Sequence, residues 1–264
     1  MSPDGPLLVA LDVDGTVLHE DGEISPAVRK AVLAASDQGH ELMLATGRSW
    51  ESTKPVLDEL GLQSDYAVCA NGALIMKREG DEYVRHHVET FDPTEVLQLI
   101  HENLDDGRYM VEYPDGFRRY TQGMTDWNLD GAEQVEFEQL LHKPVTRVVV
   151  VSPGHDEQEF LRVVEEMGLH KVTYAIGWTA WLDIAPFGVN KSTAMERVRE
   201  WIGAPQSRLV AVGDGRNDVE LLKWAGELGR GVAMGQAPDE VKDAATEVAA
   251  SISDDGLAHV LASL

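Results

Sequence analysis

The sequence predicts an α/β fold, in which a parallel sheet with helices around it is interrupted by an inserted α+β section. Three observations lead to this prediction. Short apolar runs alternate with helical patterns in residues 1–81, and the same alternation occurs in residues 187–264. Continuous apolar runs of strand length are typical of strands buried on both faces of a parallel sheet. Residues 82–186 differ, with half-apolar strands and turns. We therefore expect one domain from residues 1–81 and 187–264, and a second from residues 82–186.

The first part of the chain alternates strands and helices as an open α/β sheet does. The first helix is expected to begin at Ser25-Pro26, because serine is a favoured N-cap and proline suits the first helical position, and to end at Gly39. A second helix ends at Leu60-Gly61. The expected strands are Leu7–Leu11, Leu42–Ala45 and Tyr66–Ala70.

The inserted section is expected to be an α+β domain with its own small core. Its turn signal is YPDGF, at Tyr113–Phe117, between two strand patterns. The expected helices are Pro93–Leu104, Glu133–Leu141 and Asp156–Met167. The expected strands are Tyr83–Val88, Arg108–Tyr113, Phe117–Thr121, Val145–Val151, Val172–Ile176 and Trp181–Ile184.

The last part of the chain returns to the first pattern. We expect a helix over Ser192–Ile202 and strands at Leu209–Val212 and Gly231–Ala233, followed by helices near Pro238–Ala245 and Gly256–Leu261. Because this part shows the same alternation of strand and helix patterns as residues 1–81, we expect the two ends of the chain to build one sheet.

Composition narrows the function classes. There are 46 acidic and 22 basic residues, for a formal net charge of −24. Nucleic acids and anionic membranes are bound through basic patches, so we expect neither as a partner. No apolar run approaches the ~20 residues of a membrane span. The start, MSPDGP, lacks the pattern of a signal peptide, and the single cysteine, Cys69, fits a reducing cytoplasm. The composition leaves a monomer and a homodimer equally open.

Polar side chains follow several of the predicted strands. Asp12 and Asp14 end the first, Thr46-Gly47-Arg48 ends the second, and Asn71 ends the third. The strand at Leu209–Val212 leads to Asp214, Asn217 and Asp218, and Lys191 begins a helix. Ligands of open α/β sheets bind outside the carboxyl ends of the strands, so we expect these loops to meet at one site.

That set of groups suits phosphoryl transfer. A carboxylate can attack a phosphate ester and form an acyl-phosphate, provided that the negative charge is neutralised. A hard cation such as Mg²⁺, held by carboxylate oxygens, would do so, and it would also explain two carboxylates at the end of a buried strand. Lys191 and the Thr46 hydroxyl would hold the remaining phosphate oxygens.

Four motifs carry a resemblance to a known family. They are DVDGT at Asp12–Thr16, TGR at Thr46–Arg48, the helix-opening Lys191, and GDGRND at Gly213–Asp218. In this order the chain resembles the haloacid dehalogenase-like phosphatases, and over its whole length the Cof-type subfamily. The resemblance implies a Rossmann-like core with a large cap inserted between the second and third motifs.

The resemblance also implies roles for these residues. Asp12 would be the nucleophile, Asp14 the general acid and base, and Lys191 the cation that stabilises the transferring phosphate. Mg²⁺ would be held by Asp12, Asp14 (through its backbone carbonyl), Asp214 and Asp218. Contacts to phosphate or substrate would come from Thr46, Gly47, Arg48, Asn71, Lys191 and Asn217. The implied activity is hydrolysis of small, sugar-phosphate-like phosphomonoesters.

Other functions remain open at this point. A phosphomutase or phosphotransferase could use the same core, and GDGRND also imitates part of a dinucleotide-binding fingerprint, as in an oxidoreductase. A metal-binding protein without catalysis is a third alternative. Gln236 stands where relatives often carry asparagine, which we expect to affect contacts on the substrate side.

The inserted section is expected to set substrate choice, because the core motifs recognise only a phosphate and a metal. As a lid it would close over the site and exclude water. The side chains expected to contact the substrate beyond its phosphate are Tyr113, Arg118, Arg119, Trp178 and Trp181.

Overall fold

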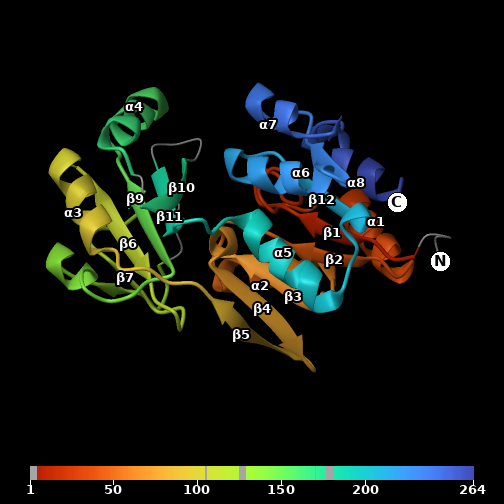
Figure 1. The fold of residues 1–264 in the computed structure, drawn as a ribbon, viewed down its shortest axis with the longest axis horizontal. Helices are drawn as coiled ribbons and strands as arrows, with labels where there is room; N and C mark the ends of the chain where they lie inside the picture. Colours follow the sequence, from red (N-terminus) through yellow and green to blue (C-terminus); the bar gives the residue numbers. More distant parts are fainter. Residues whose placement is uncertain (1–4, 105, 125–128, 170, 177–180) are drawn as a thin grey trace. The chain divides into compact units, whose positions relative to one another are not determined.

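The structure is a computed structural model, and it describes residues 5–104, 106–124, 129–169, 171–176 and 181–264. The chain forms two compact units, the first from Met1–His86 with Asn190–Leu264 and the second from His87–Val189 (Figure 1). The division therefore falls a few residues later than the expected positions 82 and 186. Among the described residues, no helix combines the length and the apolar character needed to cross a membrane.

A parallel sheet lies at the centre of the first unit, with the strand order β14-β13-β12-β1-β2. Its strands are β1 (Leu8–Leu11), β2 (Glu41–Leu44), β12 (Leu209–Gly213), β13 (Arg230–Ala233) and β14 (Glu247–Val248). β1 pairs with β2 on one side and with β12 on the other, so that Ala10 lies between Met43 and Ala211. The expectation that both ends of the chain build one sheet is confirmed.

The third expected strand turns back in a way that the sequence did not suggest. β3 (Tyr66–Cys69) meets the end of β2 in a parallel bridge between Ala45 and Val68. A short 3-10 turn then leads into β4 (Leu74–Glu79), which pairs with β3 in antiparallel fashion and is followed by β5 (Glu82–Val88). Asn71 has φ 50° and Gly72 has φ 100°, and these left-handed residues reverse the chain.

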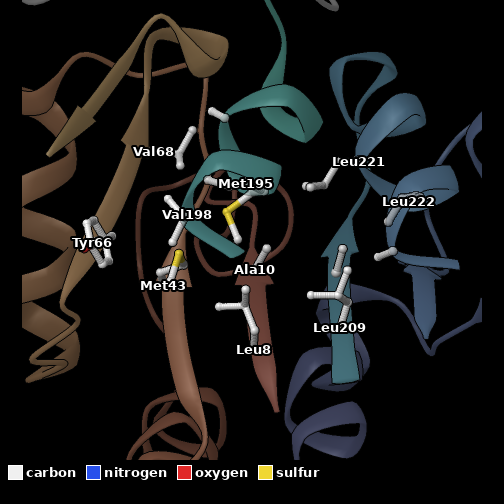
Figure 2. Packing of buried hydrophobic residues seen from close by; sticks show 14 of the residues in the cluster. Leu8, Ala10, Met43, Tyr66, Val68, Met195, Val198, Leu209, Leu221 and Leu222 are labelled. Carbon is white, nitrogen blue, oxygen red and sulfur yellow. The ribbon is translucent and has the colours of Figure 1, made fainter. Parts of the chain in front are cut away.

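Six helices accompany the described part of this sheet: α1 (Pro26–Asp37), α2 (Trp50–Leu60), α5 (Lys191–Ile202), α6 (Val219–Gly226), α7 (Asp239–Ala244) and α8 (Gly256–Leu261). As expected, Ser25 caps α1, its side chain accepting a hydrogen bond from the Val28 N–H. Figure 2 shows a core cluster of the unit, in which Leu8 and Ala10 of β1 pack with residues of α5 and α6. The labelled partners from those helices are Met195, Val198, Leu221 and Leu222.

The second unit is an α+β domain with a six-stranded sheet of order β10-β11-β9-β6-β7-β8. The strands are β6 (Arg108–Glu112), β7 (Arg118–Tyr120), β8 (Glu133–Gln134), β9 (Arg147–Val151), β10 (Val172–Ile176) and β11 (Trp181–Pro186). The helices α3 (Thr94–Asn103) and α4 (Glu157–Met167) complete it. Their apolar side chains join those of the sheet in a core that includes Ile100, Tyr109, Val148 and Phe160.

One expected helix of this unit is wrong. Glu133–Leu141 forms the short strand β8 and a 3-10 turn, Phe137–Leu140. The Val135 N–H donates to the Tyr120 carbonyl, so this segment gives its backbone hydrogen bonds to β7. Pairing with a distant strand overrides a local helical pattern here, because an edge strand offers unpaired backbone groups to whatever lies beside it.

Candidate active site

The carboxyl ends of β1, β2 and β12 bring the predicted residues together in the first unit. Asp12 follows β1 directly, and its N–H donates to the Val212 carbonyl at 2.9 Å, which extends the pairing of the two strands. Asp214 follows β12, and Thr46 follows β2 and donates its N–H to the Val68 carbonyl. Strands adjacent in the sheet therefore place Asp12 and Asp214 side by side.

Lys191 is the first residue of α5, and its side chain is fully buried. Its Nζ donates to Asp12 Oδ1 at 2.6 Å and to Asp218 Oδ1 at 2.7 Å. The start of the helix is fixed by Asn190, whose side chain accepts from the Thr193 N–H. A Cβ at Gly72 would overlap the Asn190 carbonyl, so this glycine lets the turn after β3 approach the start of α5.

Asp218 organises the loop after β12. Its Oδ2 accepts from the backbone N–H groups of Asp214 and Gly215 at 3.1 and 3.0 Å, while its Oδ1 accepts from Lys191. Asp218 has no exposed surface, whereas Asp12 is 5% and Asp214 is 7% exposed. Asp218 is therefore the deepest of the three carboxylates and already carries three hydrogen bonds.

The three carboxylates form a group that suits a metal ion. One oxygen from each of Asp12, Asp214 and Asp218 lies within 4.8 Å of the other two. Burial, then the charge of Asp218, raises the pKa of Asp12 well above its ordinary value, although Lys191 opposes the shift. The same two causes raise the pKa of Asp214 to about 6. One ammonium against three carboxylates leaves an excess of negative charge, and oxygen donors of this kind fit Mg²⁺.

Asp14 has different surroundings. Its carboxylate is largely exposed and forms a two-pronged ion pair with Arg48, in which Arg48 Nε donates to Asp14 Oδ2 at 2.9 Å. The Arg48 N–H in turn donates to the Thr46 hydroxyl at 3.1 Å. Two residues predicted for different tasks, acid–base chemistry and phosphate binding, are thus in direct contact.

The remaining predicted residues join the loops to one another. Asn217 Nδ2 donates to Asn71 Oδ1 at 3.0 Å, which connects the loop after β12 to the turn after β3. A Cβ at Gly47 would lie 3.1 Å from the Asn71 amide, so the TGR loop approaches this pair closely. All the predicted core residues therefore lie on loops that meet in the first unit.

Gln236, which the sequence connects with contacts on the substrate side, contacts the loops of the predicted metal site in the structure. It lies just beyond β13, and its Nε2 donates to the Gly15 carbonyl at 2.6 Å and to Asp214 Oδ2 at 3.2 Å. The sequence held one signal for this position: Gln236 closely follows the expected strand Gly231–Ala233, and the structure places that strand beside β12.

The residues expected to contact substrate from the second unit have local partners. Arg118 is buried and donates to the Asp130 carbonyl at 3.0 Å, and Arg119 pairs with Glu133 at 2.8 Å. Tyr113 stacks on Phe117, with ring centroids 6.2 Å apart. Trp181 begins β11 and is partly exposed, while Trp178 lies outside the described residues.

Comparison with known proteins agrees with these motifs. A family model described as haloacid dehalogenase-like hydrolase matches residues 9–261. The chain is 27% identical to the 5-amino-6-(5-phospho-D-ribitylamino)uracil phosphatase YitU of Bacillus subtilis, covering 97% of this chain and 96% of that protein. It is 26% identical to the HMP-PP phosphatase of Yersinia pseudotuberculosis, covering 96% and 93%.

Solved structures share the fold. One, described as showing a trigonal-bipyramidal intermediate in a phosphoryl-transfer superfamily, has a TM-score of 0.81 and 22% identity, over 98% of both chains. The subclass IIB sugar phosphatase BT4131 has a TM-score of 0.78 and 22% identity, over 97% of this chain and 98% of that one. At this identity the likeness concerns the fold alone, including the inserted domain.

Proposed function

The chain belongs to the haloacid dehalogenase-like hydrolase family, and from this premise we propose that it is a Mg²⁺-dependent phosphatase of small phosphomonoesters. The observation that carries the proposal is the contact between Asp12 and the buried Lys191 beside two further carboxylates. A nucleophilic carboxylate needs cations around an incoming phosphate, and this cluster supplies one and has the ligands for another.

The metal would be held by Asp12 and Asp214, with the backbone carbonyl of Asp14 as the family resemblance implies. Asp218 would support the site by positioning Lys191 and the loop after β12, since its oxygens already accept hydrogen bonds from Lys191 and from the loop N–H groups. When bound, Mg²⁺ would neutralise charge on the phosphate oxygens and so lower the barrier to attack by an anion.

The chemistry proceeds in two displacements. An oxygen of Asp12 attacks phosphorus, the bond from phosphorus to the ester oxygen breaks, and the leaving alkoxide takes a proton from Asp14. Asp14, now ionised, then removes a proton from a water molecule that attacks the same phosphorus. This step releases inorganic phosphate and restores Asp12.

The other site residues bind the phosphate. Lys191 is a point charge beside the Asp12 oxygen, and such fixed charges stabilise the transition state most in a dry site. The Thr46 hydroxyl, Arg48 and the Asn71–Asn217 pair offer hydrogen-bond donors around the same loops.

The substrate class is a small phosphorylated metabolite. Relatives are named for phosphate esters of a ribitylamino-uracil and for HMP-PP, and a structural neighbour for sugar phosphates. We extend to this chain only what they share, a compact polar group carrying phosphate. The acidic chain disfavours nucleic acid as substrate, and the single cysteine favours the cytoplasm.

The alternatives are less well supported. The relatives named above are phosphatases, which does not favour a phosphomutase or phosphotransferase. In a dinucleotide-binding protein the N–H groups after β12 would face a pyrophosphate, but those of Asp214 and Gly215 donate to Asp218. A carboxylate in that position would repel the ligand.

The test is release of inorganic phosphate from a panel of phosphate esters, with Mg²⁺ and with EDTA. We expect turnover that requires Mg²⁺, and less than about 1% of it in Asp12→Asn, because an amide does not attack phosphorus. Asp65→Asn, on the exposed Arg78–Asp65 ion pair, is the control and should retain full activity. Isomerisation of the ester without phosphate release would favour a mutase, and activity retained by Asp12→Asn would refute the nucleophile.

A further inference from the structure

Gln236 connects three separate loops of the first unit. Its Nε2 donates to the Gly15 carbonyl and to Asp214 Oδ2, and its Oε1 accepts from the Ile252 N–H at 2.9 Å. The orientation of the amide follows from these partners, since the reverse orientation would set its oxygen against two acceptors and its NH₂ group against a donor. These three hydrogen bonds fix the position and orientation of the Gln236 side chain, although the residue is exposed.

The backbone that carries Gln236 is itself held in place. The Met234 N–H donates to the Gly213 carbonyl at 3.0 Å, and the Gly235 N–H donates to the Ala250 carbonyl at 3.1 Å. A Cβ at Gly235 would lie 2.7 Å from the Ser251 N, so neighbouring backbone packs tightly against this loop. Gln236 therefore projects from a rigid base toward Asp214.

Both acceptors of the Gln236 amide lie on loops of the proposed metal site. Gly15 follows Asp14, so a bond to the Gly15 carbonyl restrains the loop that carries Asp12 and Asp14. Gly15 has φ 76°, and a Cβ there would overlap the Asp214 carboxylate, so backbone and carboxylate are in close contact. The amide contacts both, and it restrains the rotation of the Asp214 carboxylate by hydrogen-bonding one of its oxygens.

We propose that Gln236 is a positioning residue for the metal site, which holds Asp214 and the Asp12–Thr16 loop in the arrangement that binds a divalent cation. It acts through these groups and not by contact with substrate. The inference rests on the proposed function only for the identity of the cation. Hydrogen-bonding partners of metal ligands typically contribute about 10–100-fold to metal affinity, because they orient the ligands before the ion arrives.

The test compares Gln236→Met with Gln206→Met. Methionine preserves length and removes the amide. Gln206 is a suitable control, because its Nε2 also donates to a carboxylate, that of the exposed Glu227, whose Oε2 lies 2.8 Å away. Calorimetric titration of the metal-free proteins with MgCl₂ should give a dissociation constant about 10–100-fold weaker for Gln236→Met and unchanged for Gln206→Met. Without metal, the urea midpoint of each variant should equal that of the wild type, so that a weaker affinity is not a consequence of lost stability. If Gln236→Met unfolds, Gln236→Ala takes its place.

Kinetics give a second readout. Raising the Mg²⁺ concentration should restore most of the kcat of Gln236→Met, with little change in the KM for the phosphate ester. An unchanged Mg²⁺ dissociation constant, or a raised ester KM at every Mg²⁺ concentration, would overturn the inference. Wild-type protein that binds no Mg²⁺ would overturn the metal site itself. Mg²⁺ binding by the wild type without phosphatase activity would instead refute the proposed function and leave the positioning role standing.

Discussion

At the scale of single residues, Asp14 and Lys191 have opposite surroundings. The side chain of Asp14 is 62% exposed and contacts Arg48, whereas that of Lys191 has no exposure and contacts two carboxylates. An acid that serves a leaving group must reach the substrate and exchange protons with water, while a cation that stabilises a developing charge acts most strongly away from water. The exposure of each side chain suits the role proposed for it, and Asp14 would have to leave its ion pair with Arg48 to carry the proton that it donates.

For Asp14→Asn we expect slow turnover that depends on the leaving group. The amide keeps the backbone carbonyl but provides no proton, so alkyl phosphates should lose more activity than aryl phosphates, whose leaving groups need little protonation. The measurement is kcat/KM for one alkyl and one aryl ester in the wild type and the variant. An equal loss for both esters would speak against Asp14 as the acid.

For Lys191→Met we expect kcat/KM to fall by about 10²–10³-fold, as loss of one preorganised electrostatic donor typically does. The folded state should also lose stability, because Asp12 and Asp218 would keep buried charges without their cation; breaking such a pair costs about 3–5 kcal/mol. Kinetics and urea unfolding give the two values. Lys54→Met, on the exposed Lys54–Asp58 pair, is the control and should change neither by much. If Lys191→Met kept the wild-type kcat/KM, the active site could not lie at Lys191.

At the scale of elements, His40 links the start of β2 to that of β1. It lies between α1 and β2, is 5% exposed, and its Nδ1 accepts from the Leu7 N–H at 3.1 Å. Burial, then the positive charge of Arg208, lowers the pKa of His40 from its ordinary value of 6.5. The neutral ring is the form that can accept this hydrogen bond, so the fold depends on it.

This shift predicts a pH dependence of stability. As the pH falls below about 6.5, the unfolded chain takes up a proton at His40 that the folded chain resists, so the free energy of unfolding decreases until the lowered pKa is reached. Urea unfolding at pH 7 and pH 5 should show that the stability advantage of the wild type over His40→Asn shrinks at pH 5. Other titrating groups cancel in this difference. A constant difference would mean that the ring is not held neutral.

At the scale of the whole molecule, the chain separates phosphate chemistry from the rest of substrate recognition. The predicted catalytic and metal-binding residues all belong to the first unit, and the second has a separate apolar core. Since the first unit's residues bind groups that every phosphate ester carries, we propose that the second unit selects among esters.

Replacing residues 87–189 by a short flexible loop tests this division. The remaining unit keeps the core cluster of Figure 2 and all the predicted catalytic residues, so we expect it to fold and to hydrolyse a small activated aryl phosphate slowly. Selectivity between large and small esters should disappear. The measurement is kcat/KM over the ester panel, with circular dichroism to confirm folding. A folded variant that kept the wild-type order of substrates would contradict the assignment.

By itself the sequence determined the motifs, the strands they follow and the division into core and insertion. These are local features: Asp12 ends an apolar run, Ser25-Pro26 begins a helix, and Lys191 begins another, so residue type and spacing suffice. The resemblance carried by the four motifs in order also implies the chemistry, because it depends on residue types and their order alone.

Only the tertiary structure decided which distant segments pair. β12 lies beside β1 and so brings Asp214 to Asp12. The Val135 N–H donates to the Tyr120 carbonyl of β7, and the segment around Val135 therefore does not form the expected helix. The contacts of Gln236 with Gly15 and Asp214 arise in the same way, from loops far apart in the chain. Such hydrogen bonds depend on which edges and loops are neighbours after folding. Local propensity carries no information about that, because it reports only the preferences of a segment for its own backbone.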